Sequence, residues 1–483
     1  MGIPALGIEA GGDETLAQLL ERAGSNHDRW SQQVASTGHC AKPVRLAGRV
    51  DEVDKQTGEV IQKYATDNEP DGVLLIACGD RRESRCPSCA ARYRGDAFQL
   101  VAAGLRGGKG VPETIADHPM LFVTFTAPSF GPVHASRASG SVVHACRPRR
   151  AGKCKHGIPL ACWQRHELDD DRLGRPLCPK CFDYEGQVLW NALAPELWRR
   201  TTIYVRRSLA QVMGLTLKEL ERMVRLSYVK VAEYQRRGAV HFHAVLRLDG
   251  VCDDPEHFAL PPGDFSVEIL EEAVRAATRR VFAPLPQQED RPKSVVARWG
   301  EQLEVRAIEG AGSALSPKAV AAYVAKYATK SSDDLGLGET GGLRDQAETD
   351  RHLVLLVSAA QRLAERMELR KLRLDDCAYA LGFKGHWSTK SRRYSTTFTR
   401  LRQARREHVR RVRSSGRAPL DVSEREENDG RFDKRAQWRY VGSGYRNHGE
   451  AYLALCSATR AREHRRLARE QQQQERTQRR WIE

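Results

Sequence analysis

The chain has 483 residues, more than one ordinary hydrophobic core can organise, so its length predicts roughly two to four packing units. Hydrophobic residues make up 40% and charged residues 29% of the chain, and no stretch approaches the roughly 18 uninterrupted apolar residues of a membrane span, so we expect a cytoplasmic protein without a membrane partner. The formal net charge of +16 favours a polyanionic partner, and nucleic acid is the commonest large polyanion in that compartment.

The pattern of residues 1–115 indicates a small N-terminal module that is rich in cysteine. Cys86 and Cys89 form a CxxC pair, and Cys40 and Cys78 are its candidate partners. In a reducing compartment such pairs are typical of thiolate metal sites, because cytosolic thiols are kept from forming disulfides. We therefore expect a structural zinc ion in this module, with free buried thiols as the alternative.

Residues 116–335 predict a second domain that begins with a strand. The segment LFVTFTAP at 121–128 alternates apolar and hydroxyl side chains and stops at a proline, as expected of a strand with one polar face. An insertion at about 144–184 follows; it is dense in Cys, His, Gly and Pro and has no helical periodicity. It predicts another zinc site, whose candidate ligands are Cys178 and Cys181, completed by Cys154 and Cys162 or by His156 and His166. Cys146 and His144 receive no role.

Beyond the insertion, apolar periodicity and capping residues predict a mixed run of helices and strands. Helices are expected at 188–198, 215–225 and 267–281, and strands near 201–206, 227–235, 239–248 and 302–307. A tight turn joins the strands at 227–235 and 239–248, which indicates an antiparallel hairpin. Ser316 followed by Pro317 is typical of a helix start, so we expect another helix from there.

His241 and His243 form a candidate metal pincer on the second strand of the hairpin. Side chains two residues apart leave the same face of a strand, so both imidazoles can close on one cation. Glu233 and Gln235 share a face of the preceding strand, and the turn brings that face beside the histidines. Mixed nitrogen and oxygen ligands suit Mn²⁺ or Mg²⁺, which would polarise a phosphate oxygen, although affinity order alone also admits Zn²⁺ or Ni²⁺. The alternative is that these are ordinary surface or core residues.

The helix that Ser316 begins carries a second candidate group. Tyr323, Lys326, Tyr327 and Lys330 recur at i, i+3, i+4 and i+7 and therefore form one stripe. A phenolate is a competent nucleophile toward phosphorus, and neighbouring lysines favour the phenolate and screen the charge of a phosphate. The alternative is an ordinary amphipathic helix whose tyrosines cover the core.

Residues 350–483 predict a basic, mainly helical C-terminal region that binds DNA. Its segment LGFKGHWSTKSRRYSTTF combines cations with aromatic residues. Cations would neutralise phosphates and aromatic rings would stack on bases. The candidate DNA-binding residues are Lys384, Trp387, Lys390, Arg392, Arg393 and Tyr394. A solvated helical face is the alternative.

In this order, LFVTFTAP, HFH at 241–243 and YVAKYATK at 323–330 resemble the HUH endonucleases, and specifically the rolling-circle replication initiators of actinobacterial plasmids and integrative elements. The segments CPSCAARYRGDA, CPKCFDY and LGFKGHWSTKSRRYSTTF are similar to that subgroup too. The resemblance implies an α+β fold, in which a central antiparallel sheet of palm or RRM-like type carries the metal pincer and the tyrosine helix packs nearby. Cysteine-rich zinc modules and the basic helical C-terminal region would accompany it.

The resemblance also implies a mechanism. Tyr327, in the place of the nucleophile, would attack a DNA strand at the double-strand origin, leaving a 5′-phosphotyrosine and a 3′-OH primer for host helicase and polymerase. Tyr323 matches the two-tyrosine form of the family and would cleave at termination. Glu233 lies eight residues before His241, where the family often has seven, so Gln235 stays an alternative third ligand. Rival interpretations are a related transposase or relaxase, and a non-catalytic DNA-binding regulator held together by zinc.

Overall fold

The protein consists of two compact units in a computed structural model that describes residues 12–24, 26–139, 142–148, 151–252, 258–285, 296–308, 315–330, 350–415 and 432–482. One unit is Asp96–Leu401, and the other combines Met1–Gly95 with Arg402–Glu483. This division differs from the expected consecutive domains at 1–115, 116–335 and 350–483, and the expected boundary at 335 lies outside the described residues. The physical reason is that a strand near the C-terminus pairs with one near the N-terminus.

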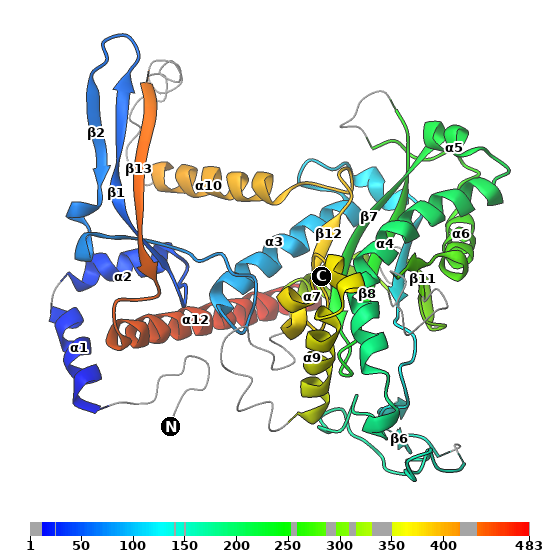
Figure 1. Ribbon diagram of the computed structural model, residues 1–483. Helices are drawn as coiled ribbons and strands as arrows, with labels where there is room; N and C mark the ends of the chain where they lie inside the picture. The colour runs from blue at the N-terminus through cyan, green and yellow to red at the C-terminus, as the bar shows by residue number, and fades with distance from the viewer. Residues whose placement is uncertain are drawn as a thin grey trace. The chain divides into compact units, whose positions relative to one another are not determined.

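The unit Asp96–Leu401 is built around a five-stranded antiparallel sheet (Figure 1). Its strand order is β11 (Leu303–Ala307), β4 (Met120–Phe125), β8 (Val240–Gly250), β7 (Val224–Tyr234) and β12 (Ser388–Lys390). The strands expected at 121–128, 227–235, 239–248 and 302–307 are confirmed, as is the hairpin between β7 and β8. The chain is therefore of the α+β class with antiparallel sheets.

Two long helices, α4 (Tyr184–Val212) and α6 (Val267–Arg280), cover one face of this sheet. Alternate residues of β4 and β8, such as Phe125 and Phe242, meet Trp198 of α4 in the main hydrophobic core. Leu270 and Val274 of α6 join the same core. Burial of one apolar stripe from each helix against one face of the sheet is the dominant stabilising term of this unit.

The strand expected near 201–206 is wrong, because those residues continue α4. Thr, Ile and Val in this segment favour a strand by propensity alone. The buried residues Leu197, Thr201 and Val205 recur every four positions, however, and so lie on one face of a helix. The Thr201 hydroxyl donates to the Leu197 carbonyl at 2.7 Å and accepts from Trp299 Nε1 at 2.8 Å. Tertiary packing therefore overrides the local preference.

The opposite face of the sheet holds a buried polar network. Arg247 of β8 is fully buried, and its Nε donates to Asp249 Oδ1 at 2.6 Å. Burial opposes ionisation of Asp249, but hydrogen bonds from His118, Arg247 and Ser227 outweigh it and lower the pKa of the carboxyl to about 2. The part of α3 (Pro87–Arg106) that belongs to this unit lies over the network, because the Gly104 carbonyl accepts from Arg247.

The unit's remaining elements are short or lie at its edges. The helices α5 and α7 match the expected helices at 215–225 and from Ser316, and α6 matches the one at 267–281. They and the other elements of the unit are α5 (Leu217–Met223), α7 (Pro317–Tyr327), α9 (Arg351–Ala364), η3 (Glu113–Asp117), η4 (Pro179–Cys181), η6 (Met367–Leu372), η7 (Asp375–Ala380), β5 (Arg137–Ser139), β6 (Val142–His144), β9 (Ala283–Pro284) and β10 (Val296–Ala297). The helix α10 (Phe398–Ser415) begins in this unit and ends in the other.

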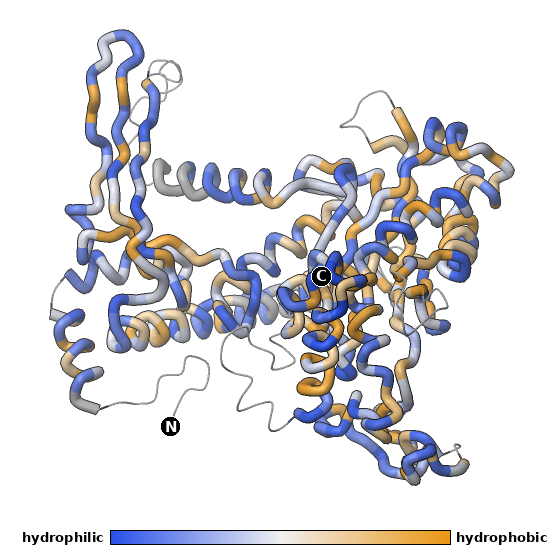
Figure 2. Tube along the Cα trace, viewed as in Figure 1, coloured by the Kyte–Doolittle hydropathy of each residue, from blue (hydrophilic) through white to orange (hydrophobic). Residues whose placement is uncertain are grey.

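The other unit is held together by strands from both ends of the chain. Its sheet places β1 (Val44–Asp54) between β2 (Val60–Ala65) and β13 (Phe432–Ser443), and β3 (Leu74–Ile76) pairs with the start of β1. Figure 2 shows hydrophilic and hydrophobic residues alternating along β1 and β2. The strand β13 falls in a region expected to be mainly helical, so that expectation is wrong for residues 432–443.

Helices complete this unit around a small apolar core of Trp30, Val34, Val73, Leu75 and Ala454. They are α1 (Gly12–Gly24), α2 (His27–Ser36) and α12 (His448–Ile482), with the short turns η1 (Thr66–Asn68) and η2 (Pro70–Gly72). A buried ion pair joins α1 to α12, since Arg22 Nη2 lies 2.5 Å from Glu450 Oε1. Within the described residues of either unit, no helix is long and apolar enough to cross a membrane.

Candidate active site and metal centres

The strand register of the larger sheet brings the candidate pincer together. His241 of β8 lies directly opposite Glu233 of β7, and His243 lies opposite Thr124 of β4. Residues directly opposite each other in an antiparallel pair point to the same face. All four side chains therefore leave the face of the sheet that α4 and α6 do not cover.

Glu233, His241 and His243 form one compact donor set. One ligand atom from each residue lies within 4.8 Å of the other two. Glu233 Oε2 is 3.2 Å from His241 Nε2 and 3.4 Å from His243 Nε2. Burial opposes ionisation of Glu233, but the two imidazoles and Lys330 outweigh it and lower the pKa of the carboxyl to about 2. The donor set can therefore hold a divalent cation with an ionised carboxylate.

Thr124 orients one of the imidazoles. Its hydroxyl lies 3.1 Å from His243 Nδ1, which leaves Nε2 of that ring facing Glu233. The Phe122 ring stacks parallel to His243 with centroids 5.9 Å apart. A hydrogen bond to the second ring nitrogen commonly fixes a metal-binding histidine. Neither Thr124 nor Phe122 was a sequence candidate, although both belong to the strand LFVTFTAP.

Gln235 is not brought into this donor set. Its side-chain oxygen accepts from Arg237 Nε at 2.9 Å. Gln235 also lines a separate cavity of about 1000 Å³, together with Arg237 and Trp299. Between the two alternatives for a third ligand, the geometry favours Glu233.

We expect Glu233→Gln to weaken binding of Mn²⁺ to zinc-loaded protein by roughly 100-fold or more, because loss of a full charge at ligand distance is worth several kcal/mol. Gln235→Ala is the matched control on the neighbouring position and should leave the affinity unchanged. Titration calorimetry measures both. Equal weakening by the two variants would contradict the assignment of Glu233.

The helix α7 carries the stripe of tyrosine and lysine side chains next to the donor set of Glu233, His241 and His243. Ser316 caps the helix as expected, since its hydroxyl accepts from the Ala319 amide at 3.3 Å. Val320 and Val324 are buried on the opposite side of the helix. The Tyr323 hydroxyl lies 3.2 Å from His243 Nε2. Burial, together with the neighbouring Tyr327 and Glu233, raises the pKa of Tyr323.

Tyr327 lies beside the same imidazole and between two ammonium groups. Its ring stacks on His243 with centroids 5.6 Å apart, and the two tyrosine rings are 4.5 Å apart. Lys330 Nζ lies 4.9 Å and Lys326 Nζ 5.6 Å from the Tyr327 ring centre. Lys330 also donates to Glu233 Oε1 at 3.3 Å. All predicted catalytic and metal residues except Gln235 therefore converge on one site.

The first cysteine group forms a four-thiol cluster, as expected. Cys40 Sγ lies 3.8 Å from Cys86 Sγ and 3.7 Å from Cys89 Sγ, and Cys78 Sγ lies 3.7 Å from Cys89 Sγ. A tetrahedral zinc ion with bonds of about 2.3 Å has sulfur atoms about 3.8 Å apart. The four thiols can therefore hold a metal such as zinc, and they lie within one unit of the chain.

The insertion, together with the segment just before it, contains two clusters where one was expected. The first combines Cys154, His156, Cys178 and Cys181, with His156 Nδ1 3.1 Å from Cys181 Sγ. The second combines His134, Cys146, Cys162 and His166. Cys162 is therefore not a partner of Cys178, because it lies 3.5 Å from the ring nitrogens of His134 and His166.

Sequence reasoning missed His134 and Cys146. The spacing of Cys162 and His166, with three residues between, was a usable signal, but their partners lie far back in the chain without a local pattern. His166 Nδ1 lies 2.7 Å from Asp170 Oδ2, the kind of carboxylate contact that orients a metal-binding imidazole. His144 is exposed and belongs to none of these clusters.

Comparison with known proteins identifies the family. A family model described as "Replication initiator protein, pSAM2" matches residues 26–459, most of the chain. The chain belongs to this family of replication initiators. A curated replication initiator protein of Streptomyces ambofaciens is 42% identical over 468 residues, which cover 94% of this chain and 95% of the relative. No solved structure matches the chain significantly.

A replication initiator is expected to bind DNA, and two of the six candidate DNA-binding residues prove to be structural. Tyr394 is fully buried, with its hydroxyl donating to the Val101 carbonyl at 3.2 Å, so it cannot stack on a base. Lys390 Nζ donates to the carbonyls of Ser391, Arg392 and Ser395, and burial lowers its pKa. Both residues fix the loop after β12.

The other four candidates of the initiator differ in exposure. Trp387 is partly buried and packs edge-on against Phe383 and Tyr234, with ring centres 5.0 and 5.1 Å away. Lys384 and Arg392 are exposed, and Arg393 is partly exposed. Lys384, Arg392 and Arg393 therefore stay accessible to a phosphate.

Proposed function

We propose that this replication initiator nicks one strand of DNA at its origin through a tyrosine nucleophile, as a member of the HUH endonucleases that its sequence resembles. The observation that carries the proposal is the 3.2 Å contact between the Tyr323 hydroxyl and His243 Nε2. This contact joins the tyrosine stripe to the donor set of Glu233, His241 and His243, although the stripe and the donor set are far apart in the sequence. A helix that only covered the hydrophobic core would not be expected to place two phenols and two ammonium groups beside such a donor set.

In the proposed reaction the phenolate oxygen of Tyr327 attacks the scissile phosphorus. The bond between phosphorus and the 3′ oxygen of the preceding nucleotide breaks, so a 5′-phosphotyrosine forms. The phenol proton passes to solvent, and the leaving 3′ oxygen takes up a proton to become the 3′-OH primer. Host helicase and polymerase would use that primer for rolling-circle replication.

The two lysines of the stripe would stabilise negative charge in the reaction. Lys326 and Lys330 lie within 6 Å of the Tyr327 ring, where they would offset the negative charge of the phosphate during attack. This contact supports Tyr327 as the first nucleophile. Tyr323, whose ring is 4.5 Å from that of Tyr327, would then cleave the strand that returns at termination.

Two imidazoles and one carboxylate fit a divalent cation such as Mg²⁺ or Mn²⁺, which when bound supplies polarisation of a phosphate oxygen. Glu233, His241 and His243 would hold it. Thr124 keeps Nε2 of His243 turned toward the site, and Lys330 balances the carboxylate from the other side.

Incubation of the protein with an origin-strand oligonucleotide and Mn²⁺ or Mg²⁺ tests the proposal, with a 5′ label to reveal the shortened product and a 3′ label to reveal the covalent adduct. The wild type should give a shortened product and a covalent adduct on denaturing gels, and His241→Ala should lose both. His408→Ala, which removes an exposed imidazole, is the matched control. DNA binding without cleavage in either metal would instead favour a non-catalytic regulator.

We also infer that the three Cys and His clusters hold structural zinc. Each offers four soft or borderline ligands, the usual closed set of a structural site. Distances of 3.1 to 3.8 Å between donor atoms match the edges of a zinc tetrahedron. Such ions would stabilise segments that have few buried apolar residues of their own.

A further inference from the structure

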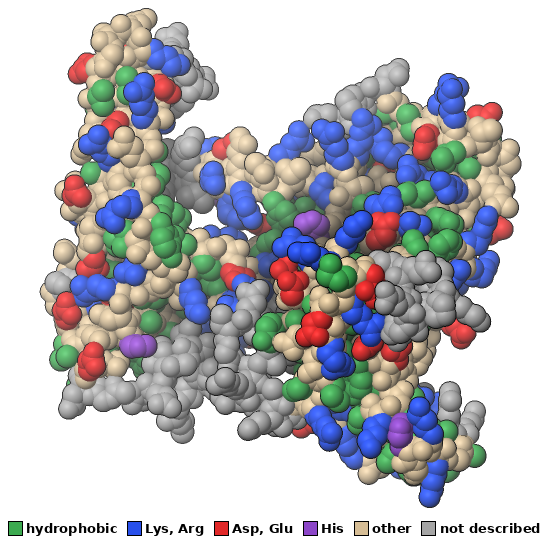
Figure 3. Space-filling view, viewed as in Figure 1, with side chains coloured by type: hydrophobic (Ala, Val, Ile, Leu, Met, Phe, Trp, Pro, Cys, Tyr) green, Lys and Arg blue, Asp and Glu red, His purple; other side chains and the backbone are tan. Residues whose placement is uncertain are grey.

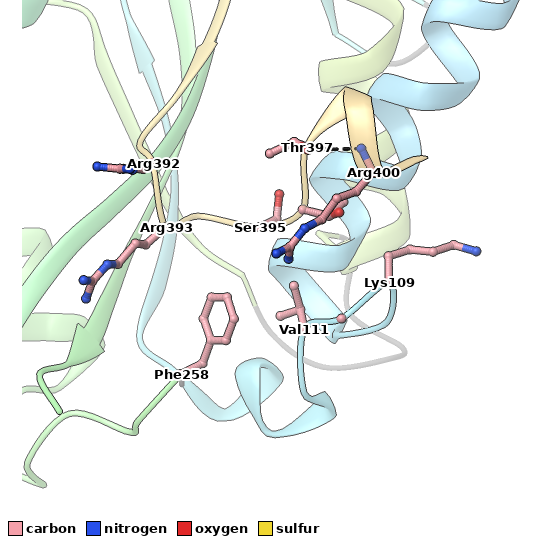
Figure 4. Close-up of a pocket in the computed structure, with 10 residues that line it drawn as sticks. Lys109, Val111, Phe258, Arg392, Arg393, Ser395, Thr397 and Arg400 are labelled. Carbon is pink, nitrogen blue, oxygen red and sulfur yellow. Dashed lines mark hydrogen bonds between the residues drawn. The ribbon is translucent and has the colours of Figure 1, made fainter. Parts of the chain in front are cut away.

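A cavity of about 560 Å³ opens in the unit Asp96–Leu401, between the loop after β12 and the turn after α3. Figure 4 shows Arg400 turning its guanidinium toward Ser395, while the Phe258 ring projects into the same space from the other side. Arg392, Arg393 and Lys109 also line the cavity at its rim, and Figure 4 shows the side chains of Arg392 and Lys109 pointing outward. None of these residues belongs to the tyrosine site.

The cavity is strongly cationic. Four of its described lining residues are Lys or Arg, and none of them is acidic. Within the described part of the chain, the structure gives the guanidinium groups of Arg392 and Arg393 no carboxylate partner. Figure 3 shows Lys and Arg side chains gathered on the part of this unit where β12 leads toward α10. Two guanidinium groups without a carboxylate partner, Arg392 and Arg393, attract an anion to this concave opening.

A second observation points to a ligand inside the cavity. Ser395 is 8% exposed, and its hydroxyl is buried without a hydrogen-bond partner. A buried hydroxyl without a partner costs free energy unless something bonds to it. Beside it, the Thr397 hydroxyl accepts from the Arg400 amide at 3.2 Å and so caps α10, whose first turn lines the cavity. A hydroxyl, a guanidinium and a helix N-terminus are the usual donors to a phosphate.

Residues next to the lining of the cavity are closely packed. Tyr394, next to Ser395, packs so closely on Gly104 that a Cβ there would overlap its ring. The Arg247 guanidinium lies between the rings of Tyr394 and Phe258, 5.0 and 5.7 Å from their centres. A site whose donors sit on a rigid base loses little entropy on binding.

We propose that this cavity holds a phosphodiester group of the DNA strand on which the initiator acts, with Arg400 and Ser395 as the inner contacts and Arg392 and Arg393 at the rim. This rests on the proposed function, since the strand is the one presented to the tyrosines. The Phe258 ring offers an apolar surface for the adjoining sugar or base.

The position of the cavity fits a strand better than a free nucleotide. Arg247, which contacts Phe258, leaves the same face of β8 as His241 and His243. The loop of the cavity joins β7 at Tyr228, where the Ser391 amide donates to the Tyr228 carbonyl at 2.8 Å. Tyr228 and Glu233 are five residues apart on β7, about 17 Å at the rise of a strand. About five stacked nucleotides cover that distance, and fewer do if extended.

Equilibrium binding tests the proposal without any need for nicking. The full chain carrying Tyr323→Phe and Tyr327→Phe is titrated with a fluorescein-labelled single-stranded oligonucleotide over a series of salt concentrations. Adding Arg400→Gln should weaken binding about tenfold and reduce the slope of log affinity against log salt by about 0.7, the value of one phosphate contact. Arg392→Gln with Arg393→Gln should lower the slope by up to about 1.4.

Two further variants separate a phosphate contact from general loss of charge or fold. Arg279→Gln removes an exposed arginine from α6, on the other side of the sheet, and should change neither affinity nor slope. Ser395→Ala should weaken DNA binding with an unchanged slope, yet keep or raise the melting temperature, because it removes the buried hydroxyl that lacks a partner. If Arg400→Gln lowers the melting temperature, the rim variant, which lies outside any helix, supplies the same comparison.

Wild-type affinity and slope in the Arg400 and rim variants would overturn the proposal, even if nicking is normal. Titration with dTMP and with inorganic phosphate distinguishes the other source of the same chemistry. Saturable dTMP binding that needs Arg400, with DNA affinity unaffected by the variants, would make the cavity a free-nucleotide site and would also overturn the proposal. If these variants weaken DNA binding but the wild-type protein shows no nicking, the result would support the cavity as a phosphodiester site and would contradict the proposed nicking function instead.

Discussion

Tyr327→Phe is expected to abolish the covalent adduct with an origin-strand oligonucleotide, lowering the rate of cleavage by roughly 10⁴-fold or more, because phenylalanine has no nucleophilic oxygen. Tyr323→Phe should still form the first adduct, since the two ammonium groups lie over the Tyr327 ring. It should fail in joining the ends of a returning strand. Denaturing gels with label on either end of the oligonucleotide separate the two steps.

The matched control for the loss of a phenol is Tyr379→Phe, because Tyr379 is 42% exposed in the same unit and away from α7. It should cleave and join like the wild type. Retention of the adduct in Tyr327→Phe, with its loss in Tyr323→Phe, would reverse the two roles. An adduct in the double variant would contradict a tyrosine nucleophile altogether.

Removal of one thiol from the four-cysteine cluster is expected to unfold the unit that contains it. The described apolar core of that unit is small, with five buried members, whereas a structural zinc ion contributes roughly 10 kcal/mol or more to folding. Cys86→Ser should therefore lose one of three zinc ions per chain and expose residues 26–95 and 432–470 to proteolysis. Elemental analysis and limited digestion measure the two effects.

Two controls make this result specific. Cys456→Ser removes a thiol of α12 that belongs to none of the clusters found among the described residues, so it should keep all three zinc ions. Cys146→Ser, in the newly found cluster of the insertion, should lose one zinc ion but leave residues 26–95 protected. A Cys86→Ser protein with full zinc content and wild-type resistance to protease would contradict a metal role for this cluster.

Short-range patterns in the sequence predict the tyrosine site well. Alternation along 239–248, a tight turn and the spacing of the two histidines indicate the β7–β8 hairpin, and Ser316 with Pro317 indicates the start of α7. The sequence alone could not decide whether Glu233 or Gln235 is the third metal ligand, because both residues lie on the same face of the strand. Which of the two side chains reaches the histidines depends on how the backbone leaves the strand and enters the turn. The hydrogen bond from Arg237 to Gln235 depends on that path.

Features that depend on distant partners could not be predicted. His134 and Cys146 join Cys162 across many residues, so no local spacing marks them. Tyr394 stands in a run of cations and polar residues that resembles a DNA-binding surface, yet the gap left by Gly104 of α3 buries it. The segment at 432–443 is basic and weakly patterned, and it becomes a strand only because β1 offers an edge.

The pairing of β1 with β13 has a consequence for the synthesis of the protein. The ribosome makes β1 near the beginning of the chain and β13 near its end, on the order of half a minute later at ordinary rates. Until then one edge of β1 lacks its partner, and an open edge readily pairs with another chain. The unit Asp96–Leu401 is fully synthesised before β13, so we expect it to fold first, while the edge of β1 is still unpaired. The N-terminal part of the nascent chain should therefore need protection from aggregation until β13 is made.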